Sequence, residues 1–543
     1  MPVRTTASDA VFRMAITEPT AIDPYRAQEI EGIGVTKQLF TGLLRVDRAH
    51  GVAPAVASSW ECDKAGRVWT FHLREGLLFS NGEPLDAASF VRGVNRALDP
   101  AANTETAYHL AGVRGFDAMR SGAADRLSGL TAPDPYTLVF ALDQVDFEFD
   151  KKTVQPVFSP VPEVAGPALN PVYNDMPIGN GPYMMAEPWQ HGRSIRLVRN
   201  PRWSGERPEV AEIHIDILGD EDSLEQEYAG FLEGRYDFAR MPAESVTAAR
   251  ELFGDGGFLE RDLPGLHYLI PFCHQAPMDT PAARRAISAA IDRAGIAEEL
   301  FSGTRVPADA LLSPWFKGVH TPGLGGAYTR HDPEVARACA RQAGLTPGSV
   351  VDLAVNTGAG HDRWVAAVAE QISRVLQVEV RLLTMSAVEL LAHRTSQAAA
   401  GLCRAGWAYD YPTPDNLLFP LLHSSCTSPD ADGTAHGDNE GRYVNTEFDQ
   451  ALLNARAAAD EGTRTGWWQT AERLAMEDMA LIPLWFRTEY RVFAEDAFTG
   501  MDLDFFGNPT IAELRPVESA DGAVPPRRSR ARDRYRVVTP SQT

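Results

Sequence analysis

Residues 351–383 alternate between strand and helix patterns, and this alternation constrains what the chain can fold into. Residues 351–356 form a short, mostly apolar run, residues 362–376 have helical spacing, and residues 378–383 again favour a strand. Strands that alternate with helices form an α/β layer built on a mostly parallel sheet. We therefore predict an α/β fold with a mostly parallel sheet.

Other segments add local elements to this prediction. Residues 11–16 and 68–73 read as strands, the second because polar and apolar side chains alternate along it. Asn81-Gly82 indicates a tight turn. Residues 87–97 read as a helix that Asp99-Pro100 ends, and residues 277–303 read as a further helical segment.

Length and charge limit the class of protein. With 543 residues, the chain is too long for one ordinary core, so we expect two or three domains. A formal net charge of −22 argues against nucleic acid as a partner, because phosphates require a basic surface. No apolar run approaches the roughly 18 residues of a membrane span.

The cysteines and the two chain ends carry little chemistry. The five cysteines include no CxxC pair, so zinc or another metal is not expected, and one disulfide remains open without identifiable partners. The N-terminal residues show no apolar signal region. The basic, Pro-rich residues 515–543 are typical of a disordered tail.

The segment LCRAGWAYDYPTP, residues 402–414, is the strongest functional signal. An acid next to an aromatic ring, Asp410 and Trp407, suits a cationic amine, and the guanidinium of Arg404 suits a carboxylate. A free peptide or amino acid carries both groups. Taken alone, Asp410 is also typical of a turn residue before Pro412, and Arg404 of a surface ion pair. The chain has neither HExxH nor GxSxG, so we expect binding without catalysis and without a cofactor.

Several segments together resemble a known family. They are EPTAIDP with QLFTGLL, then PAVASSWECDKAGRVWTFHLREGLLFSNGEPLDAASFVRGVNRALDP, IGNGPY with VRNPRW, ARRAISAAIDRAGIAEELFSG, and LIPLWF. In this order, they resemble the family 5 solute-binding proteins of ABC importers, the peptide and nickel class. The resemblance runs from Glu18 to about Leu514, which is nearly the whole chain.

RAGWAYDY is most similar to the oligopeptide-binding branch of that family, and this resemblance implies a set of ligand-binding residues. Asp410 would receive the α-ammonium of a peptide and Arg404 its α-carboxylate, with Trp407 and Tyr409 beside them. His361 and, with a shift of one position, Arg394 would be further carboxylate anchors. The resemblance adds four residues from the N-terminal part of the chain: Gln28, Ile30, Glu31 and Tyr108. Ala408 replaces a disulfide cysteine of that branch, so the bridge is expected to be absent or moved, with Cys273 and Cys403 as one alternative pair.

The resemblance also implies an architecture. It is a two-lobed, type II periplasmic-binding-protein-like fold with an extra domain and a cleft that closes about a hinge. Lobe I would comprise residues 1–45, 176–270 and a return at 487–514. The extra domain would comprise residues 46–175, lobe II residues 271–486, and the basic tail residues 515–543.

The implied function is the capture of oligopeptides outside the cytoplasm, by a monomer, for an ABC importer permease. The acidic charge favours short peptides that contain Arg or Lys. Alternatives within the family are a nickel or haem-type solute, or an antibiotic precursor such as those of clavulanic acid clusters. A peptidase is the alternative outside it.

Overall fold

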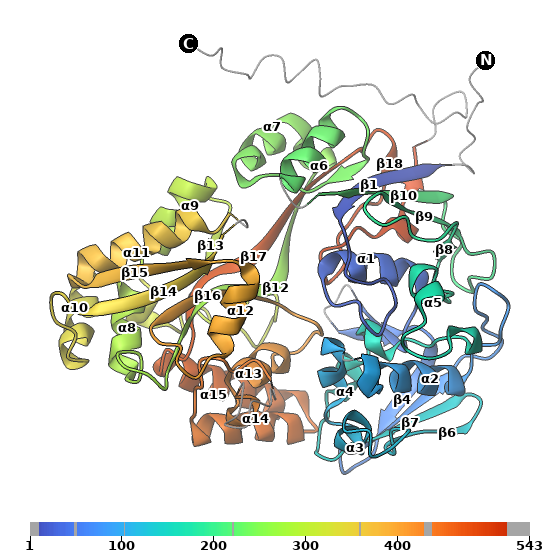
Figure 1. The fold of residues 1–543 in the computed structure, drawn as a ribbon, viewed down its shortest axis with the longest axis horizontal. Coiled ribbons are helices and arrows are strands. Elements are labelled where there is room, and N and C mark those ends of the chain that lie inside the picture. The colour runs from blue at the N-terminus through green and yellow to red at the C-terminus, as the bar shows by residue number, and fades with distance from the viewer. Residues whose placement is uncertain are drawn as a thin grey trace. The chain divides into compact units, whose positions relative to one another are not determined.

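The structure is a computed structural model that describes residues 10–47, 51–102, 104–219, 222–357, 360–427 and 437–517. The chain forms two compact units (Figure 1). Unit 1 contains residues 1–261 and 489–543, and unit 2 contains residues 262–488. The chain passes between the units inside two long strands, β12 (Phe258–Pro271) and β17 (Ile482–Phe493). Unit 1 is therefore built from both ends of the sequence.

Unit 1 contains a four-stranded sheet in the order β1-β10-β9-β8. Its strands are β1 (Val11–Thr17), β10 (Glu212–Leu218), β9 (Ser194–Arg199) and β8 (Tyr183–Met185). β1 runs parallel to β10, with Val11 opposite Glu212, whereas β9 is antiparallel to β10. Phe12, Ile195 and Ile213 are fully buried in the core beside this sheet, together with Leu39 of helix α1 (Ile30–Leu39). The strand predicted at residues 11–16 is confirmed as β1.

A second sheet of unit 1 has the order β4-β5-β7-β6. Its strands are β4 (Ala57–Cys62), β5 (Val68–Leu73), β7 (Thr137–Ala141) and β6 (Leu130–Asp134). β5 is the strand predicted at residues 68–73, and its buried side chains are Trp69, Phe71 and Leu73. The Asn81-Gly82 turn is confirmed, because Gly82 adopts φ +92° and its N–H donates to the carbonyl of Phe79.

Helix α2 (Ala87–Leu98) is the helix predicted at residues 87–97. Asp86 caps it by accepting a hydrogen bond from the Ser89 N–H at 3.0 Å, while the Ser89 hydroxyl accepts one from the Asp86 N–H. The remaining helices and strands of unit 1 are α3 (Phe116–Arg120), α4 (Phe149–Lys152), α5 (Pro171–Asp175), α6 (Ser223–Leu232), α7 (Val246–Gly257), β2 (Leu44–Val46), β3 (Val52–Pro54), β11 (Phe238–Ala239), β18 (Phe498–Thr499) and β19 (Arg515–Pro516).

Unit 2 contains the strand–helix–strand pattern predicted from residues 351–383. The elements are β14 (Val350–Asn356), α11 (Asp362–Leu376) and β15 (Glu379–Met385), and β14 runs parallel to β15. Helix α11 packs on both strands. β16 (Leu402–Ala408) follows on the other side of β14, and the order continues to β12 and β17, with β13 (Val306–Pro307) paired to β17.

The prediction of a mostly parallel sheet was wrong. Only β15 and β16 run parallel to β14, whereas β12 is antiparallel to β16, and β11 and β13 are antiparallel to β17. A crossover helix requires parallel pairing only for the strands that it joins. The pattern in residues 351–383 does not extend to β12 and β17.

The segment predicted as helical at residues 277–303 is two helices, α8 (Pro281–Ala290) and α9 (Arg293–Phe301). Ile291 is extended, and Asp292 begins α9 by accepting a hydrogen bond from the Gly295 N–H at 2.9 Å. The other helices of unit 2 are α10 (Pro333–Gln342), α12 (Ala387–Thr395), α13 (Asp415–Leu422), α14 (Thr446–Ala457) and α15 (Glu461–Glu477).

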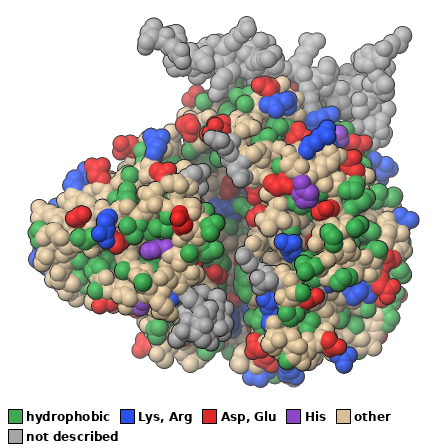
Figure 2. All heavy atoms as spheres, viewed as in Figure 1, with side chains coloured by type: hydrophobic (Ala, Val, Ile, Leu, Met, Phe, Trp, Pro, Cys, Tyr) green, Lys and Arg blue, Asp and Glu red, His purple; other side chains and the backbone are tan. Residues whose placement is uncertain are grey.

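The structure describes the first three residues of the predicted tail and all five cysteines. Arg515 and Pro516, placed in the tail by the sequence analysis, form β19 against β18, and residues 518–543 of the predicted tail lie outside the described residues. All five cysteines are free, including Cys273 and Cys403. Within the described ranges, no helix combines the length and the apolar character of a membrane span. Acidic and basic side chains are interspersed on the face drawn in Figure 2.

Candidate functional site

β16 carries the segment that the sequence analysis singled out, and one of its edges is only partly covered. β12 pairs with β16 along its whole length, from Pro271 opposite Leu402 to Gly265 opposite Ala408. β14 pairs with β16 only at Leu402 and Cys403. In the part of the chain that the structure describes, no strand covers this second edge from residue 404 onward. Such an edge can accept an extended ligand through backbone hydrogen bonds.

The side chains of β16 alternate between a buried and an open face. Cys403 and Ala405 are buried, whereas Arg404 is half-buried and Gly406 and Ala408 are exposed. This alternation follows from the two-residue period of a strand. It places Arg404 on the open face of β16.

Arg404 is held by an amide instead of a carboxylate. Its Nε donates to Oδ1 of Asn356, at the end of β14, at 2.7 Å, and its Nη2 donates to the same oxygen. No carboxylate of the described chain pairs with this guanidinium. Burial lowers the pKa of Arg404. A charge held in this way is oriented but not neutralised, which suits the binding of an external carboxylate.

His361 lies at the start of α11, and its protonation state follows from its neighbours. The Nε1–H of Trp364 donates to Nδ1 of His361 at 3.1 Å, so the ring hydrogen of the neutral imidazole lies on Nε2. Burial, and then the positive charges of Arg404 and Arg305, lower the pKa of His361 to about 4. His361 is therefore a neutral hydrogen-bond donor beside two guanidinium groups at pH 7. His361 is close enough to Arg404 for the guanidinium charge to lower its pKa, and its role as a further carboxylate anchor stays a prediction.

Near the end of β16, Trp407 and Asp410 are both held by the side chain of Asn416, which is fully buried. Its Nδ2 donates to Oδ2 of Asp410 at 3.1 Å, and its Oδ1 accepts from the Asp410 N–H at 2.8 Å. The same Oδ1 accepts from Nε1 of Trp407 at 3.1 Å. Asn416 therefore fixes the acid and the aromatic ring relative to each other.

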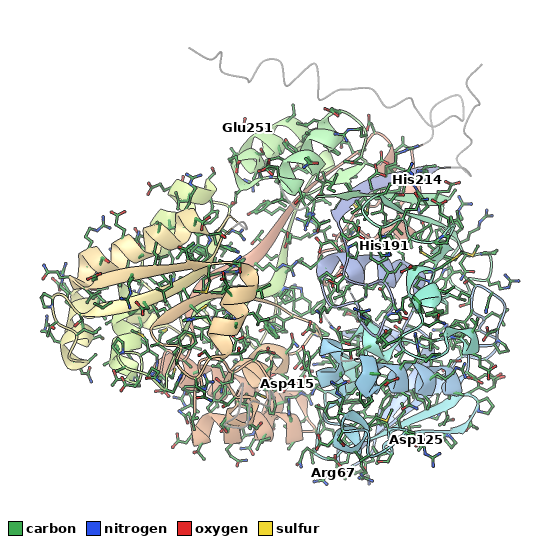
Figure 3. The ribbon with its side chains drawn as sticks, viewed as in Figure 1. Arg67, Asp125, His191, His214, Glu251 and Asp415 are labelled. Carbon is green, nitrogen blue, oxygen red and sulfur yellow. The ribbon has the colours of Figure 1, made fainter. Side chains whose placement is uncertain are left out.

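Asn416 lies in the first turn of α13. It directly follows Asp415, which Figure 3 labels. Asp415 is buried and accepts hydrogen bonds from Nε and Nη2 of Arg456, at 2.6 and 3.0 Å. Two parallel N–H···O bonds of this kind hold a carboxylate in one orientation. The ion pair thus anchors the helix turn that presents Asn416.

Tyr409 is buried, and its ligand-binding role stays a prediction. It was expected beside the ligand, but only 2% of the residue is exposed and its ring packs on Phe316 with centroids 4.8 Å apart. Tyr409 has the same parity as the buried Cys403 and Ala405, whereas Trp407, which shares this parity, is half-buried. Tyr409 belongs to the core of unit 2.

Arg394 lies in the last turn of α12 and is already paired. Its Nε donates to Oε2 of Glu440 at 2.5 Å. Burial acts to lower the pKa of Arg394, but the charge of Glu440 outweighs it, so the net shift is upward. A ligand carboxylate at Arg394 would have to compete with Glu440, and the anchoring role of Arg394 stays a prediction.

The site residues predicted in unit 1 lie in two places. Gln28 is exposed just before α1, and Ile30 and Glu31 lie in its first turn. Tyr108 lies in the 3-10 helix Glu105–Leu110, is 39% exposed, and has its ring 4.0 Å from that of His109. The ligand-binding roles of these four residues stay predictions.

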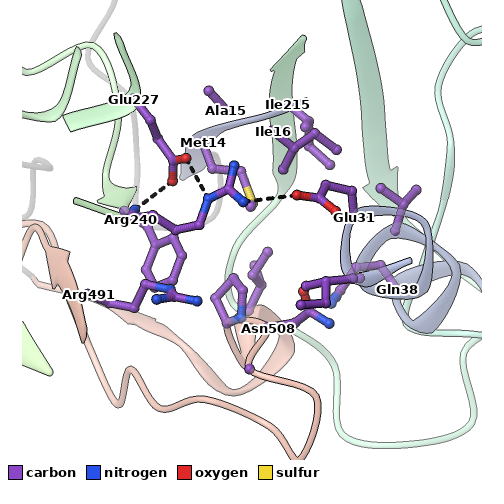
Figure 4. A pocket seen from close by; sticks show the side chains of 17 residues that line it. Met14, Ala15, Ile16, Glu31, Gln38, Ile215, Glu227, Arg240, Arg491 and Asn508 are labelled. Atoms are coloured by element: carbon purple, nitrogen blue, oxygen red, sulfur yellow. Dashed lines mark hydrogen bonds and ion pairs between the residues drawn. The ribbon is translucent and has the colours of Figure 1, made fainter. Parts of the chain in front are cut away.

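Ile30 and Glu31 also line a cavity in unit 1 that is partly open to solvent (Figure 4). Arg240 lies on its wall, where Nε donates to Glu227 at 2.8 Å and Nη1 donates to Glu31 at 2.9 Å. Arg491 and Asn508, from the C-terminal part of the chain, complete the polar wall. Sequence reasoning missed all of these residues except Ile30 and Glu31, because no local pattern links positions so far apart in the chain.

Metal binding finds no support in the described residues, which contain no group of three His, Cys, Asp or Glu side chains arranged around a common point. Arg404 on β16 and Asp410, two residues beyond the end of this strand, are instead a separate cationic and a separate anionic group. Arg404 and Asp410 are six positions apart, which corresponds to roughly 20 Å for an extended chain.

The sequence and the fold are similar to those of known proteins. Residues 51–429 match the family described as bacterial extracellular solute-binding proteins, family 5 Middle. The chain is 26% identical over 492 residues to "Oligopeptide-binding protein OppA" of Bacillus subtilis, covering 87% of this chain and 86% of that protein. It is 27% identical over 489 residues to "Probable deoxycholate-binding periplasmic protein YgiS" of Escherichia coli, covering 87% of this chain and 86% of that protein.

A solved structure, "Clavulanic acid biosynthesis oligopeptide binding protein 2", has the same fold. It superposes with a TM-score of 0.80 over 95% of this chain and 97% of that chain, at 22% identity. The periplasmic-binding-protein fold expected from the resemblance is thus confirmed. Family 5 consists of non-catalytic binding proteins, which confirms that the chain is not an enzyme. The match over more than half of the sequence shows that the chain belongs to the bacterial extracellular solute-binding proteins of family 5.

Proposed function

We propose that the protein captures short peptides with a free N-terminal ammonium and a free C-terminal carboxylate. Asp410 would receive the ammonium and Arg404 the carboxylate. The observation that carries the proposal is that Arg404 lies where β14 stops covering the edge of β16, and Asp410 lies two residues beyond the end of the same strand. A charge-assisted hydrogen bond at each end is roughly twice as strong as a neutral one.

The edge of β16 supports a peptide over other zwitterions. An enclosed peptide must pair its own N–H and C=O groups, since each unpaired group costs about 1–3 kcal/mol. Residues 404–408 offer backbone partners along the edge that β14 leaves uncovered. Backbone pairing of this type does not depend on the ligand's side chains. It therefore suits a protein that accepts many peptide sequences.

The spacing of the two charges indicates the length of the ligand. Six positions of fully extended chain span roughly 20 Å, of which the two side chains take up part, and an extended peptide rises about 3.4 Å per residue. Peptides of about three to five residues fit this span. The carboxylate would also meet His361, whose Nε2–H is a donor next to Arg404.

Delivery to an ABC importer permease outside the cytoplasm is part of the proposal. It is supported by the extracellular family and by relatives whose names include oligopeptide-binding and periplasmic proteins. We expect a monomer whose ligand binding is coupled to a hinge motion at β12 and β17, where the chain passes between the units. The net charge of −22 would concentrate peptides that contain Arg or Lys around the protein at low salt.

A second candidate is a non-peptide solute that carries a carboxylate. The cationic group of Arg404 and Arg305 beside His361 suits any carboxylate, and one relative is named for deoxycholate. A solved structure of the same fold is named for clavulanic acid biosynthesis. An antibiotic precursor is therefore another solute considered in this second candidate. Deoxycholate has no ammonium group, so the affinity for a solute of that kind would not depend on Asp410.

Calorimetry with one tetrapeptide in free, N-acetylated and C-amidated forms tests the proposal. We expect Asp410→Ala to lower the affinity for the free peptide at least tenfold, and the N-acetylated peptide to bind poorly to the unchanged protein. Glu477→Ala, which changes an exposed acid of α15, is the control and keeps full affinity. Equal affinity for free and N-acetylated peptides would contradict the proposal, and peptide cleavage seen by mass spectrometry would contradict a binding function.

A further inference from the structure

Trp364 is the hydrogen-bond partner of His361 in unit 2. His361 directly precedes α11, and Trp364 lies in the first turn of this helix. The Nε1–H of Trp364 donates to Nδ1 of His361 at 3.1 Å, and the two ring planes are at 86°. A spacing of three positions brings two side chains together on one side of a helix. The contact therefore follows from the local geometry of α11.

Trp364 is itself held in place by the core of unit 2. Only 5% of the residue is exposed, and its ring meets that of Trp485 edge-on, with centroids 5.4 Å apart. Nε1 of Trp485 donates to the carbonyl of Arg293 at 3.1 Å. The buried guanidinium of Arg293 donates in turn to the carbonyls of Ser288, Ile291, Thr329 and Pro483. The Trp364 ring is thus packed in one orientation, with its N–H on His361.

The hydrogen bond from Trp364 leaves His361 able to donate but not to accept. Burial and the charges of Arg404 and Arg305 lower the pKa of His361 to about 4, so the ring is neutral at pH 7. A neutral imidazole has one N–H and one acceptor nitrogen. Since Nδ1 already accepts from Trp364, the hydrogen lies on Nε2, and the ring has only this N–H to offer a ligand.

Arg404 is a second group that can only donate. Its guanidinium donates to Oδ1 of Asn356, the last residue of β14, and His361 follows Asn356 by five positions. A guanidinium has no acceptor atom, and a carboxylate has no donor, so the two match. The NH₂ of a carboxamide would find an acceptor on neither Arg404 nor His361. An enclosed NH₂ without a partner costs about 1–3 kcal/mol.

We propose that Trp364 is a positioning residue that makes this site select a carboxylate over a carboxamide. The inference rests on the proposed function, because it takes the peptide carboxylate to lie at Arg404 and His361. Without the Trp364 N–H, the ring hydrogen of His361 is able to move to Nδ1, and Nε2 becomes an acceptor. Arg404 would then donate to the oxygen of an amide while Nε2 of His361 accepts from its NH₂. Specificity for the free carboxylate would fall.

Nitrogen NMR of the ligand-free protein with isotope-labelled histidine tests the first step without any peptide. We expect His361 to show the Nε2–H tautomer at pH 7, and the loss of its signals in His361→Gln identifies them. Trp364→Phe keeps an aromatic ring but removes the N–H, so the Nδ1–H tautomer should become populated. Trp60→Phe, which removes an N–H that donates to Asp150 at 3.0 Å in unit 1, is the matched control and should leave His361 unchanged.

Calorimetry with one tetrapeptide in its free and C-amidated forms tests the specificity. We expect the unchanged protein and Trp60→Phe to bind the free form about tenfold more tightly, and Trp364→Phe to do so by about threefold or less. In the His361→Gln background, Trp364→Phe should not change this preference, because the Gln carboxamide both donates and accepts.

Two results would overturn the inference. One is an Nδ1–H tautomer of His361 in the unchanged protein, a measurement that does not depend on how any Trp364 variant folds. The other is a full preference for the free carboxylate in a Trp364→Phe protein that unfolds cooperatively in urea. Both leave the dependence on the free α-ammonium intact. Loss of that dependence contradicts the proposed function instead, so the two failures are distinguishable.

Discussion

Asn416 and Asp410 are joined by two reciprocal hydrogen bonds at the end of β16, with the Asn416 amide donating at 3.1 Å and accepting at 2.8 Å. Since the same amide accepts from Trp407, one buried side chain orients both the acid and the ring proposed to receive a ligand ammonium. A carboxylate that is held in place loses little freedom when it binds, which preserves affinity.

We expect Asn416→Leu to weaken both stability and binding. The change leaves the N–H groups of Trp407 and Asp410 without their partner, which should lower the free energy of unfolding by about 2–4 kcal/mol in urea titrations. The affinity for a free tetrapeptide should fall at least fivefold by calorimetry, because Asp410 is no longer oriented. Asn454→Leu should show neither effect, and a variant that keeps full affinity would show that Asn416 has only a structural role.

Arg404→Met should lower the affinity for a peptide with a free C-terminal carboxylate about tenfold, because the oriented guanidinium is lost. For the C-amidated form of the same peptide, the affinity should change less than twofold. Arg473→Met, at an exposed ion pair of α15, is the matched control. An equal loss for the free and amidated peptides would place the carboxylate elsewhere.

Peptide binding should become tighter as the pH falls from 7 toward 5. Burial, Arg404 and Arg305 lower the pKa of His361 to about 4, and a bound carboxylate adds a negative charge that raises it. The complex therefore takes up protons, and we expect a gain in affinity of about fivefold between pH 7 and pH 5.

Calorimetry in two buffers of different ionisation enthalpy measures this proton uptake directly. His361→Gln keeps a hydrogen-bond donor but cannot take up a proton, so its affinity should be level between pH 7 and pH 5. A C-amidated peptide should also show no uptake. Uptake by the free peptide that persists in His361→Gln would assign the titration to another group.

The stability of unit 2 should decrease as the pH rises through the range set by Glu472. This residue is fully buried, accepts from the N–H groups of Leu311 and Leu312 at 2.9 and 2.7 Å, and has its pKa raised by burial from 4.5 to about 8. Between these two pH values, the folded state keeps the proton and the unfolded state loses it. The stabilisation is therefore complete below about pH 4.5 and is lost as the pH approaches 8, by up to about 4 kcal/mol.

Glu472→Gln keeps an acceptor oxygen and cannot ionise, so its free energy of unfolding should be nearly level over this range. Glu477→Gln, an exposed position on the same helix, should keep the slope of the unchanged protein. Urea unfolding at pH 5, 6.5 and 8 measures the difference. A slope that is the same in all three proteins would show that Glu472 does not set it.

Local sequence patterns were sufficient to predict several helices and strands and part of the candidate site. The run of apolar residues before Asn356 and the helical spacing of residues 362–376 correspond to β14 and α11. The alternation in β16 places Arg404 on the open face and Cys403 in the core. The same period gives Tyr409, one residue past β16, the parity of the buried face, and the residue is buried.

No local sequence pattern predicts which amide side chains orient the charged groups. Asn356 reaches Arg404 from another strand, and Asn416 reaches Asp410 from the following helix. Hydrogen bonds of this kind depend on the distance between elements, which tertiary packing sets. The pairing of β16 with β12 and its early separation from β14 are likewise properties of the sheet.

The sequence by itself determined the α/β class, the family and the charged residues of one strand, because side-chain periodicity and local motifs act over a few neighbouring positions. Tertiary structure alone decided that Arg240, Arg491 and Asn508 line one cavity and that an amide holds Asp410 in place. These contacts join residues up to several hundred positions apart, and chain folding brings them together through packing and burial that no local pattern encodes.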